Sequence, residues 1–221
     1  MNSSSTINVT GADAFEFLQG QLTNDLKRLP QKQEILAAWC SPKGRVICLF
    51  NISAIDDGYQ LSLAAELTEE IIKRLTMFRF RSKVEFASNT ETTTVDAAAS
   101  IKAGIPWIGQ DQTEKFTPHM LNLDLLDAVD FEKGCYTGQE IVARTHYKGA
   151  TKRRVQRFES DSPVNVGDKI SLDGRDIGEV LNASGNDLLA VVPVEKAGEH
   201  LSVEDAKLTL MPLPYFDVAV S

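Results

Sequence analysis

The hydrophobic pattern of the chain changes at about Gly149, and this change limits the folds that the chain can adopt. Beyond it come short β-prone segments with turn residues between them and little helical pattern, at 153–159, 169–172, 176–182, 188–194 and 206–211. Short, evenly spaced strands of this kind are typical of a small antiparallel barrel. We therefore expect a C-terminal β-barrel over residues 151–221.

The first 150 residues mix strand and helix patterns without strict alternation. Two apolar runs, at 34–40 and 45–52, flank the turn Ser41-Pro42-Lys43-Gly44 and predict a hairpin. Farther on, an alternating strand at 59–63 precedes a helix with an apolar stripe at Leu67, Ile71, Leu75 and Phe78. The pattern predicts an α+β domain. We divide it into a first lobe at 1–87 and a reduced second part at 88–150, in which 120–129 is expected to be a buried helix.

Charge and cysteine content exclude several classes of protein. The formal net charge of −8 argues against a general nucleic-acid binder. No run approaches the ~18 apolar residues of a membrane helix, and the polar N-terminus lacks the features of a signal peptide, so we expect a cytoplasmic protein without a membrane partner. Three cysteines without a C-x-x-C spacing predict neither a disulfide framework nor a metal site.

One cysteine stands in a stretch that points to chemistry, Lys133-Gly134-Cys135-Tyr136-Thr137-Gly138-Gln139-Glu140. Thr137 and Glu140 have the spacing of a capping box, which predicts a helix with Ile141, Val142 and Thr145 on one face. Cys135 would then lie close to the unsatisfied N–H groups of the first turn, and Lys133 nearby would favour a thiolate. The alternative is a glycine-containing turn with an inert cysteine.

Two other segments could be structural or functional. The polar triplet Thr23-Asn24-Asp25 lies between Leu22 and Leu26 and is either a helix cap or a polar wall of a ligand pocket. Trp107 follows a bent Gly104-Ile105-Pro106 segment and is either a pocket wall or a core residue.

Basic residues accumulate between 144 and 157 without an intervening acid. They are Arg144, Lys148, Lys152, Arg153, Arg154 and Arg157. Such a run either protects a strand edge from pairing or forms a basic rim for an anionic ligand or an RNA backbone.

Several of these motifs together resemble the YgfZ family, whose members are folate-binding proteins linked to tRNA modification. The family is part of the glycine-cleavage T-protein (aminomethyltransferase) superfamily. The resemblance is carried by the Cys135 stretch with its continuation through Arg144 to Arg153, by 17–25, by Pro42-Lys43-Gly44-Arg45 and by Leu213-Pro214-Tyr215. It implies folate-binding lobes around a channel, followed by a C-terminal barrel.

The resemblance also implies a cofactor, partners and a site. The cofactor would be tetrahydrofolate, possibly polyglutamylated, and the partners would be iron–sulfur enzymes, including those that thiolate tRNA. Cys135 would be the reactive group. The expected folate-binding residues are Thr23, Asn24, Asp25, Trp107, Lys133, Tyr136, Gln139, Glu140 and Arg144.

The chain departs from the family pattern in three places. Only 88–103 fills the gap where relatives have a further lobe, so this chain resembles a shortened member. Lys102 stands where relatives often have an acid suited to the N–H edge of a pterin. The aromatic residues that line the folate site in relatives have no match at Ser4 or Asp96.

Three functions are consistent with these observations. The first is a folate-dependent accessory protein for iron–sulfur cluster assembly or repair and tRNA modification, which need not be a classical enzyme. The second is a tetrahydrofolate-dependent aminomethyltransferase, for which Asp25 would be the acid or base. The third is an RNA-binding module that uses the basic residues 144–157.

Overall fold

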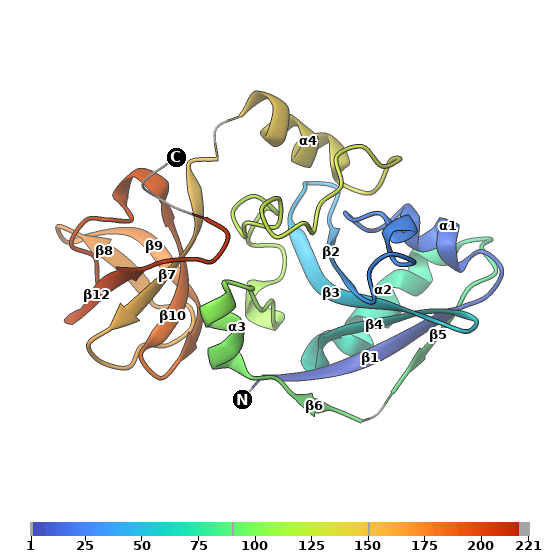
Figure 1. Cartoon of the computed structure of the whole chain (residues 1–221), viewed down its shortest axis with the longest axis horizontal. Coiled ribbons are helices and arrows are strands. Elements are labelled where there is room, and N and C mark those ends of the chain that lie inside the picture. The colour runs from blue at the N-terminus through green and yellow to red at the C-terminus, as the bar shows by residue number, and fades with distance from the viewer. Residues whose placement is uncertain (1, 90, 150, 217–221) are drawn as a thin grey trace.

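The computed structural model describes residues 2–89, 91–149 and 151–216 and contains an α+β lobe and a closed barrel (Figure 1). This arrangement confirms the fold class expected from the sequence. None of the helices in the described part of the chain is long and apolar enough to cross a membrane.

The lobe is built on an antiparallel sheet in the order β2-β3-β4-β1-β5, with β6 also paired to β1. Its strands are β1 (Ser3–Thr10), β2 (Ile35–Cys40), β3 (Val46–Ile55), β4 (Gly58–Ala64), β5 (Glu85–Ser88) and β6 (Thr93–Thr94). The predicted hairpin is confirmed as β2 and β3, which pair from Ile35 with Ile52 to Cys40 with Val46. One face of this sheet contributes to the first hydrophobic core.

Two helices, α1 (Ala14–Gln19) and α2 (Thr68–Arg79), contribute to the first core. The stripe predicted for α2 is confirmed at Leu67, Ile71 and Leu75, which are buried. Phe78 is 46% exposed, although its ring packs edge-on against Trp39. Short 3₁₀ helices at Leu26–Arg28 and Ala65–Leu67 complete the lobe.

Residues 97–149 connect the lobe to the barrel through α3 (Ala97–Ala103), a 3₁₀ helix at Gln110–Gln112 and α4 (Gln139–Lys148). The helix predicted over 120–129 is wrong: this segment consists of turns. Asn122 and Asp127 adopt positive φ angles of 56°, which an α-helix does not accommodate. Leu121 and Leu123 are nevertheless buried, so the apolar pattern indicated burial but not helix.

The barrel closes in the order β10-β7-β12-β11-β8-β9. Its strands are β7 (Arg153–Ser160), β8 (Lys169–Leu172), β9 (Arg175–Ser184), β10 (Asp187–Pro193), β11 (Ser202–Val203) and β12 (Ala206–Met211), with a 3₁₀ helix at Val194–Lys196. The sequence pattern predicted all of these strands except β11. With two residues, β11 is too short to show a period, yet it links β8 to β12.

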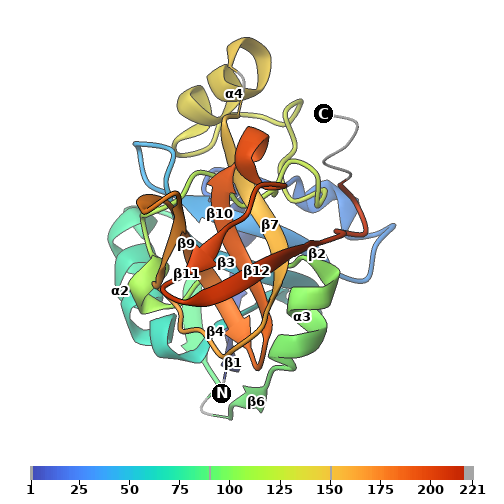
Figure 2. The same ribbon diagram turned by 90° about the vertical axis from the view of Figure 1, so that its left-hand side faces the viewer.

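A second hydrophobic core joins the barrel to the lobe. It combines Ala38 and Leu49 of the hairpin with Leu121 of the turn segment and with Leu189 and Val191 of the barrel. Figure 2 shows α3 beside the barrel and α4 projecting beyond it. The barrel is therefore packed against the first 150 residues.

Candidate functional site

Lys133 connects the cysteine stretch to residues 19–25, which we call the opening turn. Its side chain is buried, and Nζ donates hydrogen bonds to the carbonyl oxygens of Gln19, Leu22 and Asn24 at 2.8, 2.6 and 3.0 Å. An ammonium group has three N–H donors, so these carbonyls satisfy it completely. Burial lowers the pKa of Lys133 to about 8. The ammonium group is therefore committed to the opening turn rather than to the thiol of Cys135.

Thr23 and Asn24 are fully buried and fasten the same turn. The Thr23 hydroxyl donates to the Ala128 carbonyl at 2.7 Å and accepts from the Ala38 N–H at 2.8 Å. The Asn24 side chain donates to the carbonyls of Leu36 and Asp127. These hydrogen bonds all go to main-chain groups of other segments, so the two side chains stabilise the fold.

Asp25 caps the 3₁₀ helix at Leu26–Arg28, which confirms the capping interpretation for this residue. Its carboxylate accepts from the Lys27 N–H at 2.9 Å and from the Gln19 amide at 2.8 Å. Burial raises the pKa of this carboxyl group, but the hydrogen bonds and the charges of Lys27 and Lys133 outweigh it and leave the pKa lowered.

The start of α4 differs from the predicted capping box. The helix begins at Gln139 with Gly138 as its N-cap, and no side chain caps it. Gly138 has a φ of 84°, and a Cβ atom there would lie 2.5 Å from the Ser41 carbonyl oxygen. Only glycine fits so close to the hairpin turn in this conformation. The prediction of a Thr137–Glu140 box is therefore wrong, because it did not include this tertiary contact.

The hairpin turn and α4 also fit together at a second glycine. Gly44 has a φ of 65°, and a Cβ atom there would lie 2.8 Å from the Cβ of Ile141. Of the face predicted for α4, Val142 is buried, whereas Ile141 remains 42% exposed beside the turn. Farther along α4, the His146 ring stacks on Phe131 with 3.7 Å between ring centroids. Sequence reasoning missed this aromatic contact, since Phe131 shows no periodic relation to the helix.

Cys135 is exposed between two buried anchors. Lys133 is 7% exposed on one side and Tyr136 is 7% exposed on the other, with the Lys133 ammonium 5.2 Å from the Tyr136 ring centroid. Burial raises the pKa of the Tyr136 hydroxyl. The other two cysteines are buried in the hairpin, and burial raises the pKa of Cys40 to about 12. The fold thus presents one thiol to solvent and hides two.

The remaining predicted site residues fall into two places. Gln139, Glu140 and Arg144 lie on α4, where the Gln139 side chain accepts from the Tyr136 N–H at 3.3 Å and the other two are exposed. Trp107 lies elsewhere, with its backbone N–H and carbonyl bound by the Asn182 side chain, both at 2.9 Å. The structure therefore brings together the opening turn, the hairpin turn and the cysteine stretch, but it does not bring Trp107 to them.

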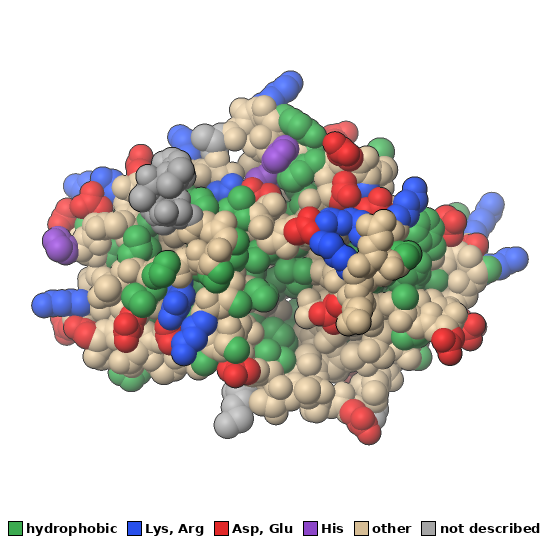
Figure 3. Space-filling model, viewed as in Figure 1, with side chains coloured by type: hydrophobic (Ala, Val, Ile, Leu, Met, Phe, Trp, Pro, Cys, Tyr) green, Lys and Arg blue, Asp and Glu red, His purple; other side chains and the backbone are tan. Residues whose placement is uncertain are grey.

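Trp107 lines a cavity of about 200 Å³ between the sheet and the segment after α3. The sheet contributes Leu36, Leu49, Asn51 and Ser62 to its wall. No Asp or Glu occurs among the described residues that line it. Figure 3 shows hydrophobic side chains reaching the surface between the barrel and the lobe on the face drawn there.

The six basic residues of 144–157 do not share one surface. Arg154 forms a two-point ion pair with Asp124, at 2.9 and 2.8 Å, which ties β7 to the turn segment. Arg157 pairs with Asp187 at 2.7 Å inside the barrel sheet. Arg153 lines a cavity between the domains, and Arg144, Lys148 and Lys152 are exposed. A continuous basic rim is therefore not formed.

Comparisons with known proteins agree with this architecture. Residues 152–215 match the family described as the CAF17 C-terminal β-barrel domain. An aminomethyltransferase T of the glycine cleavage system from Bartonella henselae has a similar structure, with a TM-score of 0.75 at 15% identity, covering 96% of this chain and 84% of the other. This similarity shows that the fold is shared.

Curated relatives align over three quarters or more of the chain. The tRNA-modifying protein YgfZ of Klebsiella pneumoniae is 25% identical over 291 residues, covering 94% of this chain and 89% of the relative. An uncharacterized protein of Haemophilus influenzae is 28% identical over 210 residues, covering 75% of each chain. An alignment of 291 positions with a chain of 221 residues places gaps in this chain, as expected for a shortened form. The resemblance is therefore confirmed: this chain is similar to the YgfZ proteins over most of its length, and its C-terminal part matches the CAF17 C-terminal β-barrel domain.

Proposed function

We propose that this protein is a cytoplasmic accessory protein for tRNA modification, which presents Cys135 as a reactive thiol to iron–sulfur enzymes. The observation that carries the proposal is the exposure of this thiol between Lys133 and Tyr136, in a chain that buries its other two cysteines. Lys133 holds the segment by binding three carbonyls of the opening turn, and Tyr136 is buried beside it. The YgfZ relatives are described as tRNA-modifying proteins, which supports the same role.

Folate binding is the second part of the proposal. The cavity beside Trp107 is the candidate for the pterin ring, because an aromatic wall and polar groups such as Asn51 and Ser62 suit a flat heterocycle. Its volume of about 200 Å³ suits one ring system rather than a whole folate. Since no carboxylate lines it among the described residues, we expect weak binding, with a Kd on the order of micromolar or higher, or roughly −8 kcal/mol or weaker.

The aminomethyltransferase alternative receives no support from the placement of Asp25. Its carboxylate caps a 3₁₀ helix and accepts from Lys27 and Gln19. A general base must reach the proton that it removes, and a carboxylate committed to a cap is poorly placed for this.

Loss and restoration of the protein in cells tests the tRNA-modification role. Deletion of the gene should lower the content of thiolated nucleosides in tRNA, and expression of the wild-type chain should restore it. The measurement is mass spectrometry of digested tRNA. An unchanged nucleoside content after deletion would overturn the proposed role, whatever the affinity for folate.

Calorimetric titration with tetrahydrofolate tests the folate part separately. Trp107→Ala should weaken binding, whereas Trp39→Phe, a change in the core at a residue that does not line the cavity, should not weaken it in protein that remains folded. If the Trp107 variant and the wild type bind tetrahydrofolate with equal affinity, folate binds elsewhere. That result would not bear on the proposed role of the Cys135 thiol.

A further inference from the structure

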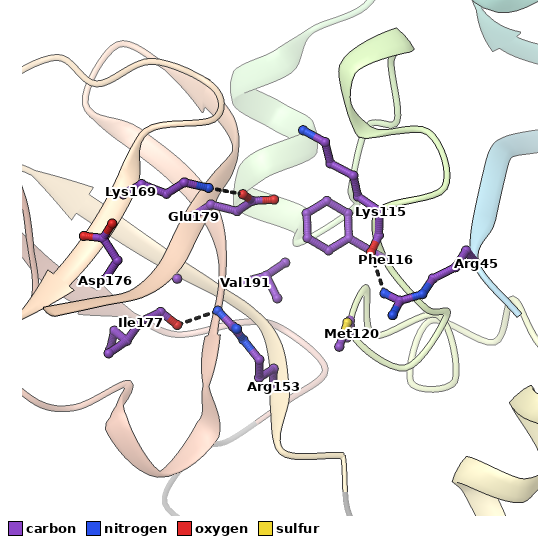
Figure 4. A pocket seen from close by; sticks show the side chains of 11 residues that line it. Arg45, Lys115, Phe116, Met120, Arg153, Lys169, Asp176, Ile177, Glu179 and Val191 are labelled. Atoms are coloured by element: carbon purple, nitrogen blue, oxygen red, sulfur yellow. Dashed lines mark hydrogen bonds and ion pairs between the residues drawn. The ribbon is translucent and has the colours of Figure 1, made fainter. Parts of the chain in front are cut away.

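A second cavity, of about 450 Å³, lies between the lobe and the barrel (Figure 4). Arg45, Lys115, Phe116 and Met120 form one side of it, and residues of strands β7 to β10 form the other. It shares no lining residue with the cavity beside Trp107. Its volume is within the range of small-molecule sites, roughly 300–1,000 Å³. Nothing in the proposed function uses it.

The two acidic residues of this cavity have different partners. Glu179 forms an ion pair with Lys169 at 2.7 Å. Asp176 accepts a hydrogen bond from the Ser171 hydroxyl at 3.0 Å. Three cations remain in the lining, Arg45, Lys115 and Arg153, and none of them has an ion-pair partner in the described part of the chain.

Backbone carbonyls orient the two arginines without neutralising them. Arg45 donates to the Lys115 carbonyl at 2.6 Å, and Arg153 donates to the Ile177 carbonyl. The Nε of Arg153 is buried and has no hydrogen-bond partner among the described residues. A buried guanidinium N–H without an acceptor is costly, so Arg153 is held beside the cavity with part of its hydrogen-bonding capacity unmet.

The space between the arginines is apolar. In the view of Figure 4, Phe116 and Met120 lie between Arg45 and Arg153. Phe116 is buried, and Ile177 and Val191 contribute further apolar wall. With Lys169 paired to Glu179 and Asp176 in no ion pair among the described residues, the lining of four cations and two carboxylates keeps a net charge of +2 around an apolar floor, in a chain of net charge −8. This lining matches a ligand with concentrated negative charge and an apolar body, because guanidinium groups bind phosphate and carboxylate in two-point geometry.

We propose that this cavity binds a small organic dianion, a phosphomonoester or a dicarboxylate with an attached apolar group. Arg153 and Arg45 hold the anionic group from the two domains, Lys115 adds charge, and Phe116 and Met120 contact the apolar part. An RNA backbone is a poorer match, since it requires an extended basic surface and the neighbouring Arg154 and Arg157 are paired with acids.

Titration of the purified full chain with phenyl phosphate, followed by calorimetry, tests the proposal. We expect saturable binding that is tighter than that of inorganic phosphate, because only phenyl phosphate reaches the apolar floor. Phthalate replaces the phosphate by a dicarboxylate, and comparison of the two aromatic anions identifies the preferred anionic group. Arg153→Met should weaken binding by tenfold or more. Lys152→Met, which changes the exposed neighbour on the same stretch, should leave it unchanged.

Lys115→Met is a second variant that is not expected to disturb folding, because Lys115 is exposed. It should weaken phenyl phosphate binding several-fold and leave the thermal midpoint unchanged. Equal losses for the Lys152 and Lys115 variants would show unspecific charge attraction and overturn the proposal. Absence of saturable binding by both aromatic anions would overturn it as well. So would tRNA that displaces phenyl phosphate from the wild type and that binds the Lys115 and Arg153 variants as tightly as it binds the wild type.

Discussion

The Lys133 Nζ atom lies 2.6 Å from the carbonyl oxygen of Leu22, a residue 111 positions earlier in the chain, in a buried site. Two further carbonyls, of Gln19 and Asn24, complete its coordination. This contact joins the first turn of the protein to the segment that presents Cys135. Lys133 is therefore a structural residue, and it acts on Cys135 by fixing the position of the segment that contains it.

Replacement of Lys133 by methionine should destabilise the protein. The variant keeps the apolar stem but leaves three buried carbonyls without their donor, and each buried unsatisfied group costs about 1–3 kcal/mol, partly offset by relief of charge burial. We expect a net loss of about 2–3 kcal/mol in the free energy of unfolding, measured by urea denaturation. Lys148→Met, on the exposed side of α4, should change it by less than about 0.5 kcal/mol.

The cost of this substitution should depend on pH. Burial lowers the pKa of Lys133 from 10.5 to about 8. Between these values the unfolded chain binds a proton that the folded chain does not, so this group makes the free energy of unfolding rise with pH. Below pH 8 the group is protonated in both states and contributes no slope. The difference between wild type and Lys133→Met should therefore grow from pH 8 to pH 10, and a constant difference would contradict the assigned burial.

Two glycines of the cysteine stretch should differ sharply in their tolerance of alanine. Gly138→Ala forces a Cβ atom to within 2.5 Å of the Ser41 carbonyl at a positive φ, and we expect a loss of about 2 kcal/mol or more. Gly134→Ala meets nothing within 4 Å and should be nearly neutral. Thermal denaturation of the two variants measures this contrast, and similar midpoints would show that α4 does not start against the hairpin as described.

Iodoacetamide at pH 8 should label Cys135 before either of the other cysteines. Cys135 is exposed, whereas Cys40 and Cys48 are buried in β2 and β3, and burial raises the pKa of both thiols. Their labelling requires the hairpin to open, and it should therefore follow unfolding. Peptide mass spectrometry over time distinguishes the sites. Labelling of Cys40 at the rate of Cys135 under native conditions would contradict the structure.

Much of the fold could be predicted from local patterns. Turn residues and alternation gave the β2–β3 hairpin and most barrel strands, because these signals are contained within a few residues. The turn segment 120–129 was missed because its apolar residues have a helical spacing, while its backbone is interrupted by left-handed residues. Propensity carries little information about a conformation that is set by packing between domains.

The sequence predicted which segments meet at the candidate site, but not what each of their residues does there. The motifs around Thr23, Ser41 and Cys135 do meet, yet Ala128, which accepts from Thr23, and the carbonyls that accept from Lys133 lie more than a hundred residues from their donors in the chain. No spacing rule gives such partners. For the same reason the cap of α4 was misassigned to Thr137, since the contact of Gly138 with Ser41 decides where the helix begins. The cavity of Arg45 and Arg153 combines the two domains and has no signal in either segment alone.

The Cys135→Ser variant tests most directly whether the exposed thiol carries the function of this protein. The measurement is the content of thiolated nucleosides in tRNA from cells that lack the protein and express wild type, Cys135→Ser or Gly134→Ala at equal abundance. We predict that the serine variant, which should fold normally because Cys135 is exposed, leaves the content at the level of the empty vector, whereas Gly134→Ala restores it. Full restoration by Cys135→Ser would contradict the account.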